Sequence, residues 1–269
     1  ISSSQLELVF SEPVDPSTSQ LSANYSANNG LGTPLTAVQN STNFNKVTLS
    51  FSSSFSLGTI NTLSVNNVTD ISGNSLTSTN KNFVYFLPAT AQYRDVVINE
   101  IFADPTPIVG LPDGEFVELY NPTNKYYNLG NWTLSDGSST ATFGNYILAP
   151  DSFLLLVSHS SLSDFSSYPN KIGLSSFPGL NNSGETLTLI NNNGTVIDAV
   201  EYSDKFYQDE VKKEGGFSLE QINSRAKCFN QSNWTASQNP SGGTPGSINS
   251  IWDTTRDSSL PRIVSCIAS

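Results

Sequence analysis

Five of the six carboxylates in the segment 95–121 are the first residues of this chain that could do chemistry: Glu100, Asp104, Asp113, Glu115 and Glu118. Strand alternation places Glu100 and Glu118 on the same faces as apolar neighbours. A carboxylate on an apolar face is costly unless it accepts hydrogen bonds. We therefore interpret Glu100 and Glu118 as structural acids that accept backbone N–H groups from a neighbouring loop.

Asp104, Asp113 and Glu115 admit a second interpretation, because they lie in and beside a proline-rich loop. Calcium is a hard cation that takes about six to eight oxygen ligands. These carboxylates and the nearby loop carbonyls could supply them, although the spacing matches no EF-hand loop. Calcium is thus the one cofactor that the sequence suggests, as an alternative to a purely structural role.

Catalysis has few candidate residues elsewhere. The only histidine, His159, follows an apolar strand among serines and lacks the G-x-S-x-G motif of a nucleophile elbow. One histidine and two well-separated cysteines form no zinc set. A sandwich of this type also offers no deep cleft from its own strands, so we expect no enzyme activity in this chain.

Cys228 and Cys266 are the whole thiol inventory. An even number of cysteines in an exported chain allows a disulfide, but residues far apart in sequence need not meet in space. The sequence leaves both states open.

The elements that must position these residues are strands. Short alternating runs bounded by Asn, Gly, Ser and Pro recur about every ten residues, and helical periodicity is almost absent. The fold class is therefore all-β, with two tandem Ig-like β-sandwiches in 269 residues. We expect about seven strands in the sandwich 1–88, a linker at 89–94, a larger sandwich at 95–250, and in 251–269 a tail or the start of a further domain.

Composition and charge exclude some functions. The chain has 12 Lys and Arg against 23 Asp and Glu, a net charge of −11 that repels phosphate backbones, so nucleic-acid binding is not expected. Only 13% of residues are charged, so the surface must consist largely of Ser, Thr, Asn and Gly, as in exported β proteins. No run reaches the ~18 apolar residues of a membrane span.

Three stretches of the first sandwich are distinctive: LELVFSEPVDPSTSQLSANYS, VTLSFSSSFSLGTINTLSVNNVTD and the turn at Asp70–Asn74. With them, the first sandwich resembles a bacterial Ig-like domain of the surface-layer type. The resemblance implies an Ig-like module of the kind found in tandem in secreted proteins.

The second sandwich contains a series of motifs in a fixed order: Asn99-Glu100-Ile101, the run 115–121, the run 129–136 around Trp132, the run 182–190, Asn233-Trp234 and the glycine-rich run 242–246. With these motifs it resembles the lamin tail domain. Filament assembly is not implied, because the heptad rod and prenylation box of nuclear lamins are missing. The bacterial relatives imply an appended module without an activity of its own.

These observations favour a non-enzymatic, secreted or cell-surface modular protein that acts in adhesion, spacing or display. The alternative is an accessory segment of a larger secreted hydrolase, such as a nuclease or phosphoesterase. Expected partners are proteins or glycans on a surface and neighbouring domains of the same chain. Aromatic residues expected in loops, Tyr126-Tyr127 and Phe206-Tyr207, could stack on sugar rings.

Overall fold

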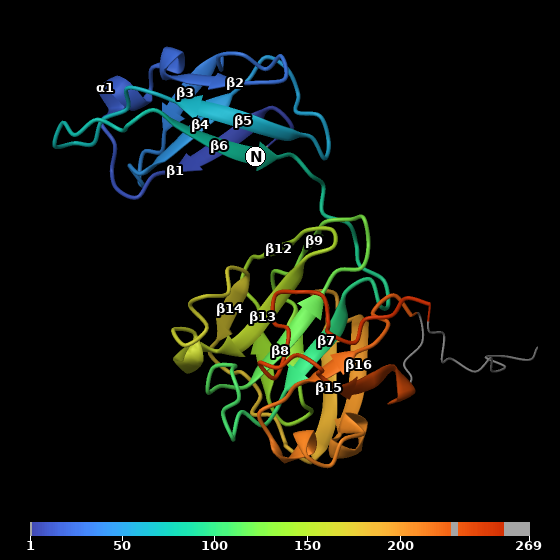
Figure 1. Ribbon diagram of the computed structural model, residues 1–269. Helices are drawn as coiled ribbons and strands as arrows, with labels where there is room; N and C mark the ends of the chain where they lie inside the picture. The colour runs from blue at the N-terminus through green and yellow to red at the C-terminus, as the bar shows by residue number, and fades with distance from the viewer. Residues whose placement is uncertain (1, 227–230, 256–269) are drawn as a thin grey trace, which may run out of the picture. The chain divides into compact units, whose positions relative to one another are not determined.

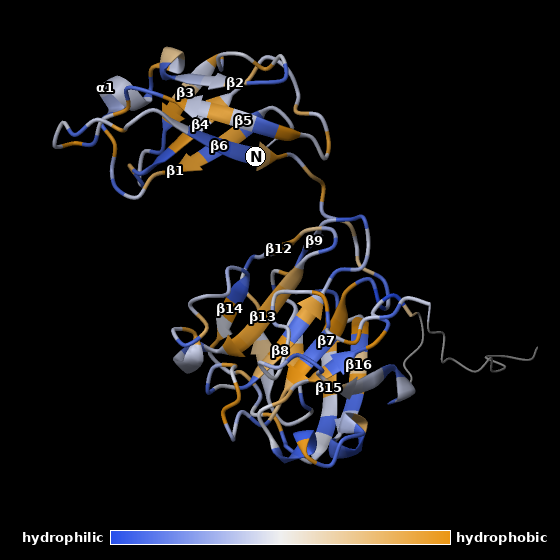
Figure 2. Ribbon diagram, in the orientation of Figure 1, coloured by the Kyte–Doolittle hydropathy of each residue, from blue (hydrophilic) through white to orange (hydrophobic). Residues whose placement is uncertain are grey.

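The computed structural model describes residues 2–226 and 231–255, and it is built almost entirely from β-sheet. The chain divides into two compact units, 1–87 and 88–269 (Figure 1). Apolar residues gather in the strands of each unit, whereas many connecting loops are hydrophilic (Figure 2). Among the described residues, no helix has the length and apolar character that a membrane span requires.

The first unit is a sandwich of two three-stranded sheets. The sheets have the orders β1-β4-β3 and β2-β5-β6, and all pairs are antiparallel. One short helix, α1 (Pro16–Ser19), begins at Asp15, whose carboxylate accepts the Ser17 N–H. The strands are β1 (Gln5–Val9), β2 (Tyr25–Ala27), β3 (Thr36–Gln39), β4 (Lys46–Ser50), β5 (Ile60–Val65) and β6 (Thr79–Val84).

Alternation explains why these segments form a sandwich. In β4, Val47 and Leu49 are fully buried while their neighbours are partly exposed. They pack with Leu63 and Val65 of β5 in one apolar cluster. Within its described residues, this unit has six strands, whereas the sequence predicted about seven.

The second unit is a larger sandwich. Its six-stranded sheet has the order β14-β13-β8-β7-β17-β18, and its four-stranded sheet has the order β11-β10-β15-β16. A separate two-stranded sheet pairs β12 with β9. The strands are β7 (Val97–Phe102), β8 (Phe116–Tyr120), β9 (Tyr127–Asn128), β10 (Thr133–Ser135), β11 (Thr140–Thr142), β12 (Ile147–Leu148), β13 (Phe153–Ser158), β14 (Lys171–Leu174), β15 (Gly184–Ile190), β16 (Val196–Ser203), β17 (Leu219–Gln221) and β18 (Trp234–Ala236).

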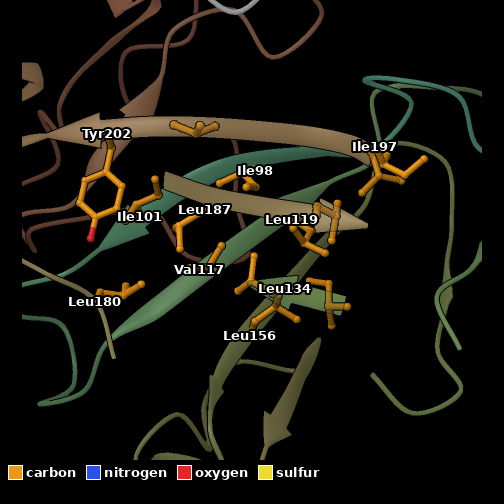
Figure 3. Close-up of a cluster of buried hydrophobic side chains, with 14 of the residues drawn as sticks. Ile98, Ile101, Val117, Leu119, Leu134, Leu156, Leu180, Leu187, Ile197 and Tyr202 are labelled. Atoms are coloured by element: carbon orange, nitrogen blue, oxygen red, sulfur yellow. The ribbon is translucent and has the colours of Figure 1, made fainter. Parts of the chain in front are cut away.

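The core of the second unit lies between its two large sheets. Leu119 of β8, Leu134 of β10 and Leu187 of β15 are fully buried there and belong to one cluster (Figure 3). The opposite face of the six-stranded sheet is also covered. Part of it carries a second apolar cluster that contains Phe102, Phe116 and Phe165.

The segment 89–94, predicted as a linker, belongs instead to the second unit. Ala89 donates its N–H to the Tyr126 carbonyl, Ala91 lies in the core cluster, and Arg94 is 1% exposed. The linker prediction rested on the lack of apolar periodicity in this segment. It was wrong because backbone hydrogen bonds and a buried ion pair, which leave no periodic pattern, hold the segment to the second unit.

The second unit also extends past residue 250. Asp253 donates its N–H to the Ile222 carbonyl, so the first residues of the expected tail are hydrogen-bonded to this unit. The remainder of the expected tail or further domain, 256–269, lies outside the described residues, as do Cys228 and Cys266.

Candidate functional site

Three glutamates form a row across the middle of the six-stranded sheet. In the strand register, Glu220 of β17 is opposite Glu100 of β7, which is opposite Glu118 of β8. All three have zero exposure to solvent. Like charges side by side in a buried site are strongly unfavourable, so each carboxyl needs compensating hydrogen bonds or a proton.

The loop 242–251 supplies most of those hydrogen bonds. Glu100 accepts the Thr244 N–H at 2.9 Å and the Ser218 hydroxyl, and Glu118 accepts the Gly246 N–H. Glu220 accepts the Ser250 hydroxyl at 2.8 Å. The row therefore holds this loop, hereafter the covering loop (242–251), against the sheet.

Burial is the main cause of the altered acidity of these carboxyls. Burial, reinforced by the charge of Glu220, raises the pKa of Glu100 from 4.5 to about 8. Burial and then the charge of Glu100 raise the pKa of Glu118 well above its ordinary value. Raised pKa values also occur in catalytic acids. Here, however, the carboxyls face the covering loop and have no access to solvent.

A β-bulge adds an amide to this row. The register between β7 and β8 shifts between Ile98 and Glu100, which leaves Asn99 as the extra residue. Its amide donates to Glu118 at 3.0 Å and to the Asn249 side chain at 2.8 Å. Asn249 in turn donates to the Gln221 carbonyl at 2.8 Å. The sequence interpretation did not identify Asn99, Asn249 or Glu220 as partners of this row, and no local pattern marks Glu220, which follows Leu219 and precedes Gln221.

The three carboxylates predicted to bind calcium do not form such a compact group. Asp104 accepts the Thr106 N–H and the Asn182 amide, while Glu115 accepts the Leu180 N–H at 3.0 Å. Asp113 is exposed. Burial raises the pKa of Glu115, and the charges of Glu185 and Asp104 add to the effect. Within residues 2–226 and 231–255, no three acidic, His or Cys side chains gather as metal ligands; calcium binding at this loop stays a prediction.

A buried ion pair joins the start of the second unit to its four-stranded sheet. Arg94 Nη1 lies 2.9 Å from Asp198 Oδ1, and both side chains have zero exposure. Asp198 also accepts the Ile98 N–H at 2.9 Å, and Arg94 Nε donates to the Ala226 carbonyl. Burial raises the pKa of Asp198, although the Arg94 charge opposes this. The arrangement is structural, because no part of the pair reaches solvent.

An open cleft of about 630 Å³ lies between the edge strands β11 and β14. The expectation was that the sandwich offers no deep cleft, and this one is open to solvent. Its polar lining includes Thr140, Thr142, Asn145, His159 and Lys171. His159 begins a 3-10 turn (His159–Ser161) and is exposed.

The aromatic residues suggested for glycan stacking are mostly core residues. Tyr127 has zero exposure, and Phe206 and Tyr207 are each 4% exposed. Tyr127 donates its hydroxyl to Asp95 at 2.9 Å. Because these rings pack in the interior of the second unit, the proposed stacking surface at these positions is wrong.

Comparison with known families gives the same division as the fold. Residues 1–86 match the bacterial Ig-like domain, and residues 89–204 match the lamin tail domain. The chain joins a bacterial Ig-like domain to a lamin tail domain. The lamin tail match begins at the segment 89–94, and the row of glutamates includes two residues of the matched region, Glu100 and Glu118, and one beyond it, Glu220.

Similarity to solved structures is distant. The N-terminal part of the bacterial S-layer protein SbsC is 11% identical, with 76% of this chain and 42% of that chain covered and a TM-score of 0.31. For the S-layer protein rSbsC(31-844) the identity is 17%, the coverage 73% and 32%, and the TM-score 0.31. A DUF4876 family protein from Bacteroides thetaiotaomicron VPI-5482 is 12% identical, with coverage of 88% and 92% and a TM-score of 0.30.

The chain spans less than half the length of those S-layer protein chains. No curated protein matches it.

Proposed function

We propose that this chain is a non-catalytic part of a secreted or cell-surface modular protein, in which it spaces, displays or attaches other groups. The observation that carries the proposal is the pair of Ig-like domains, each with its own apolar core, in one chain. Such self-contained units are suited to serial arrangement, because each one buries its own apolar surface.

The chemistry of the buried acids supports this proposal. The three buried carboxyls of the lamin tail domain, Glu100, Glu118 and Glu220, use their oxygens to hold the covering loop. A general acid must reach the proton it transfers within hydrogen-bond distance, and these carboxyls are sealed from a substrate. The low share of charged residues and the acidic balance also suit an exported surface.

Surface labelling tests the proposal directly. Antibodies raised against the 269-residue chain should label intact cells of the source organism as strongly as lysed cells, and brief protease treatment of intact cells should remove the signal. Labelling of lysed cells alone would overturn it. The complete reading frame tests the role: a hydrolase domain on the same polypeptide would favour an accessory segment, and further sandwiches would favour spacing or display.

A further inference from the structure

The cleft of the lamin tail domain lies between two strand edges. Among residues 2–226 and 231–255, β11 pairs only with β10 and ends the four-stranded sheet, and β14 pairs only with β13 and ends the six-stranded sheet. β14 lies outside β13 in Figure 1. A strand at a sheet edge presents backbone N–H and C=O groups to which another extended chain can bind.

The pairing of β14 identifies which backbone groups face the cleft. Leu155 donates its N–H to the Asn170 carbonyl, so Asn170 is directed toward β13. Backbone direction alternates along a strand, and Ile172 and Leu174 therefore also face β13. The N–H and C=O groups of Lys171 and Gly173 face outward, on the side where both residues line the cleft.

Proteins commonly protect such edges with a lysine side chain that lies over them. Lys171 is in the right position but does not do this. Its Nζ donates to the Tyr168 carbonyl at 2.8 Å and lies 3.5 Å from the Ser166 carbonyl, in the turn that precedes β14. The ammonium is thus directed toward the preceding turn and leaves the strand edge open.

The lining of the cleft limits what can bind. It contains hydroxyls from Thr140, Thr142, Ser175 and Ser176, the imidazole of His159 and a cation at Lys171, but no carboxylate and no Phe, Tyr or Trp ring. A sugar ring would therefore find none of the large aromatic side chains on which sugars usually stack. The net charge of the chain, −11, disfavours acidic ligands in general, but the lining of this cleft includes Lys171 and no carboxylate. The local charge therefore favours an acidic occupant at this site.

We propose that the edge of β14 binds an extended, acidic segment of a partner protein by strand addition. The segment hydrogen-bonds to the outward backbone groups of Lys171 and Gly173, and its carboxylates face the hydroxyl-lined cleft. Four residues of β14 span roughly 13 Å, so about four to five residues of the partner are bound. The site would suit a surface module and a hydrolase accessory segment equally, so it does not depend on the function proposed above.

Nuclear magnetic resonance on the whole chain tests this site with the peptide acetyl-Thr-Glu-Val-Glu-Val-Thr-amide. The amide signals of Lys171 and Gly173 should shift on titration. Those of Thr140 and Thr142 should shift less, because the peptide does not pair with β11. The same peptide with Lys in place of Glu should bind roughly tenfold more weakly. No shifts, shifts of the β11 amides alone, or equal binding of both peptides would overturn the proposal.

Three variants separate backbone pairing from charge. Lys171→Pro removes one outward N–H and should abolish binding, since proline is tolerated at an edge but cannot donate there. Lys171→Gln keeps the N–H and should weaken binding only a few-fold. Thr142→Pro, the matched change on β11, should leave affinity within about twofold. Should Lys171→Pro fail to fold, the shifts of the unaltered chain decide; full affinity in a folded Lys171→Pro protein would contradict strand addition.

Discussion

At the scale of single residues, the row Glu220–Glu100–Glu118 makes stability depend on pH. The pKa of Glu100 rises from 4.5 to about 8 in the folded chain, so the folded state keeps a proton that the unfolded state releases. The free energy of unfolding should therefore be greatest below about pH 4.5 as far as this group is concerned, and should fall as pH rises toward 8, by at most about 1.4 kcal/mol per pH unit.

Denaturant titrations between pH 5 and pH 9 would measure this dependence, with the range chosen from the two pKa values. Glu100→Gln, which stays neutral, should flatten the curve. Glu201→Gln, at an exposed position of β16, should keep the slope of the unaltered chain. Equal slopes in all three proteins would show that Glu100 does not hold the proton.

The buried ion pair leads to a second prediction at this scale. Arg94→Ala leaves Asp198 charged, buried and without its cation, which should destabilise the lamin tail domain by about 3–5 kcal/mol. Arg225→Ala breaks the exposed pair with Asp151, whose side chains are 45% and 64% exposed, and should cost about 1 kcal/mol or less. Thermal unfolding of both variants provides the comparison, and similar losses would contradict the structural role of the buried pair.

At the scale of elements, the covering loop depends on a glycine that lies against the glutamates. A Cβ at Gly243 would lie 2.5 Å from Glu100 Oε1 and 2.8 Å from Leu111 Cδ1. Gly243→Ala should therefore displace the loop and destabilise the domain by about 1–3 kcal/mol. Gly179→Ala, where a Cβ meets nothing within 4 Å, is the matched control and should change stability little. Hydrogen exchange at Thr244 and Gly246 would show whether the loop has loosened.

The strands themselves were largely predictable from the sequence, because alternation records which face of a strand is buried. In β7 and β8, however, every residue is buried, so alternation alone did not show that the face carrying Glu100 and Glu118 is covered as well. Pairing between distant segments was not predictable. The register that sets Glu220 beside Glu100, and the parallel pairing of β14 with β13 that creates the cleft, depend on contacts over many residues. No local pattern records them.

At the scale of the whole molecule, the two separate cores predict two separable unfolding events. Val47 belongs to the core of the Ig-like domain and Leu156 to that of the lamin tail domain, and both have zero exposure. Leu156→Ala should destabilise its domain by about 2–5 kcal/mol, and Val47→Ala should affect only the other transition. Differential scanning calorimetry would detect this; a single transition shifted by either change would contradict independent cores.

Because the segment 88–94 is attached to the second unit, it determines where the domain boundary should be placed for recombinant expression. A recombinant lamin tail domain that began at Asp95, at the apparent start of its first strand pattern, would lack the Arg94 cation and leave Asp198 uncompensated in the interior. One that began at Pro88 keeps the cation, the Ala89 hydrogen bond and the buried Ala91. Fusions, domain exchanges and truncations of this protein should therefore be joined between Leu87 and Pro88, with at least residues through Asp253 retained at the other end.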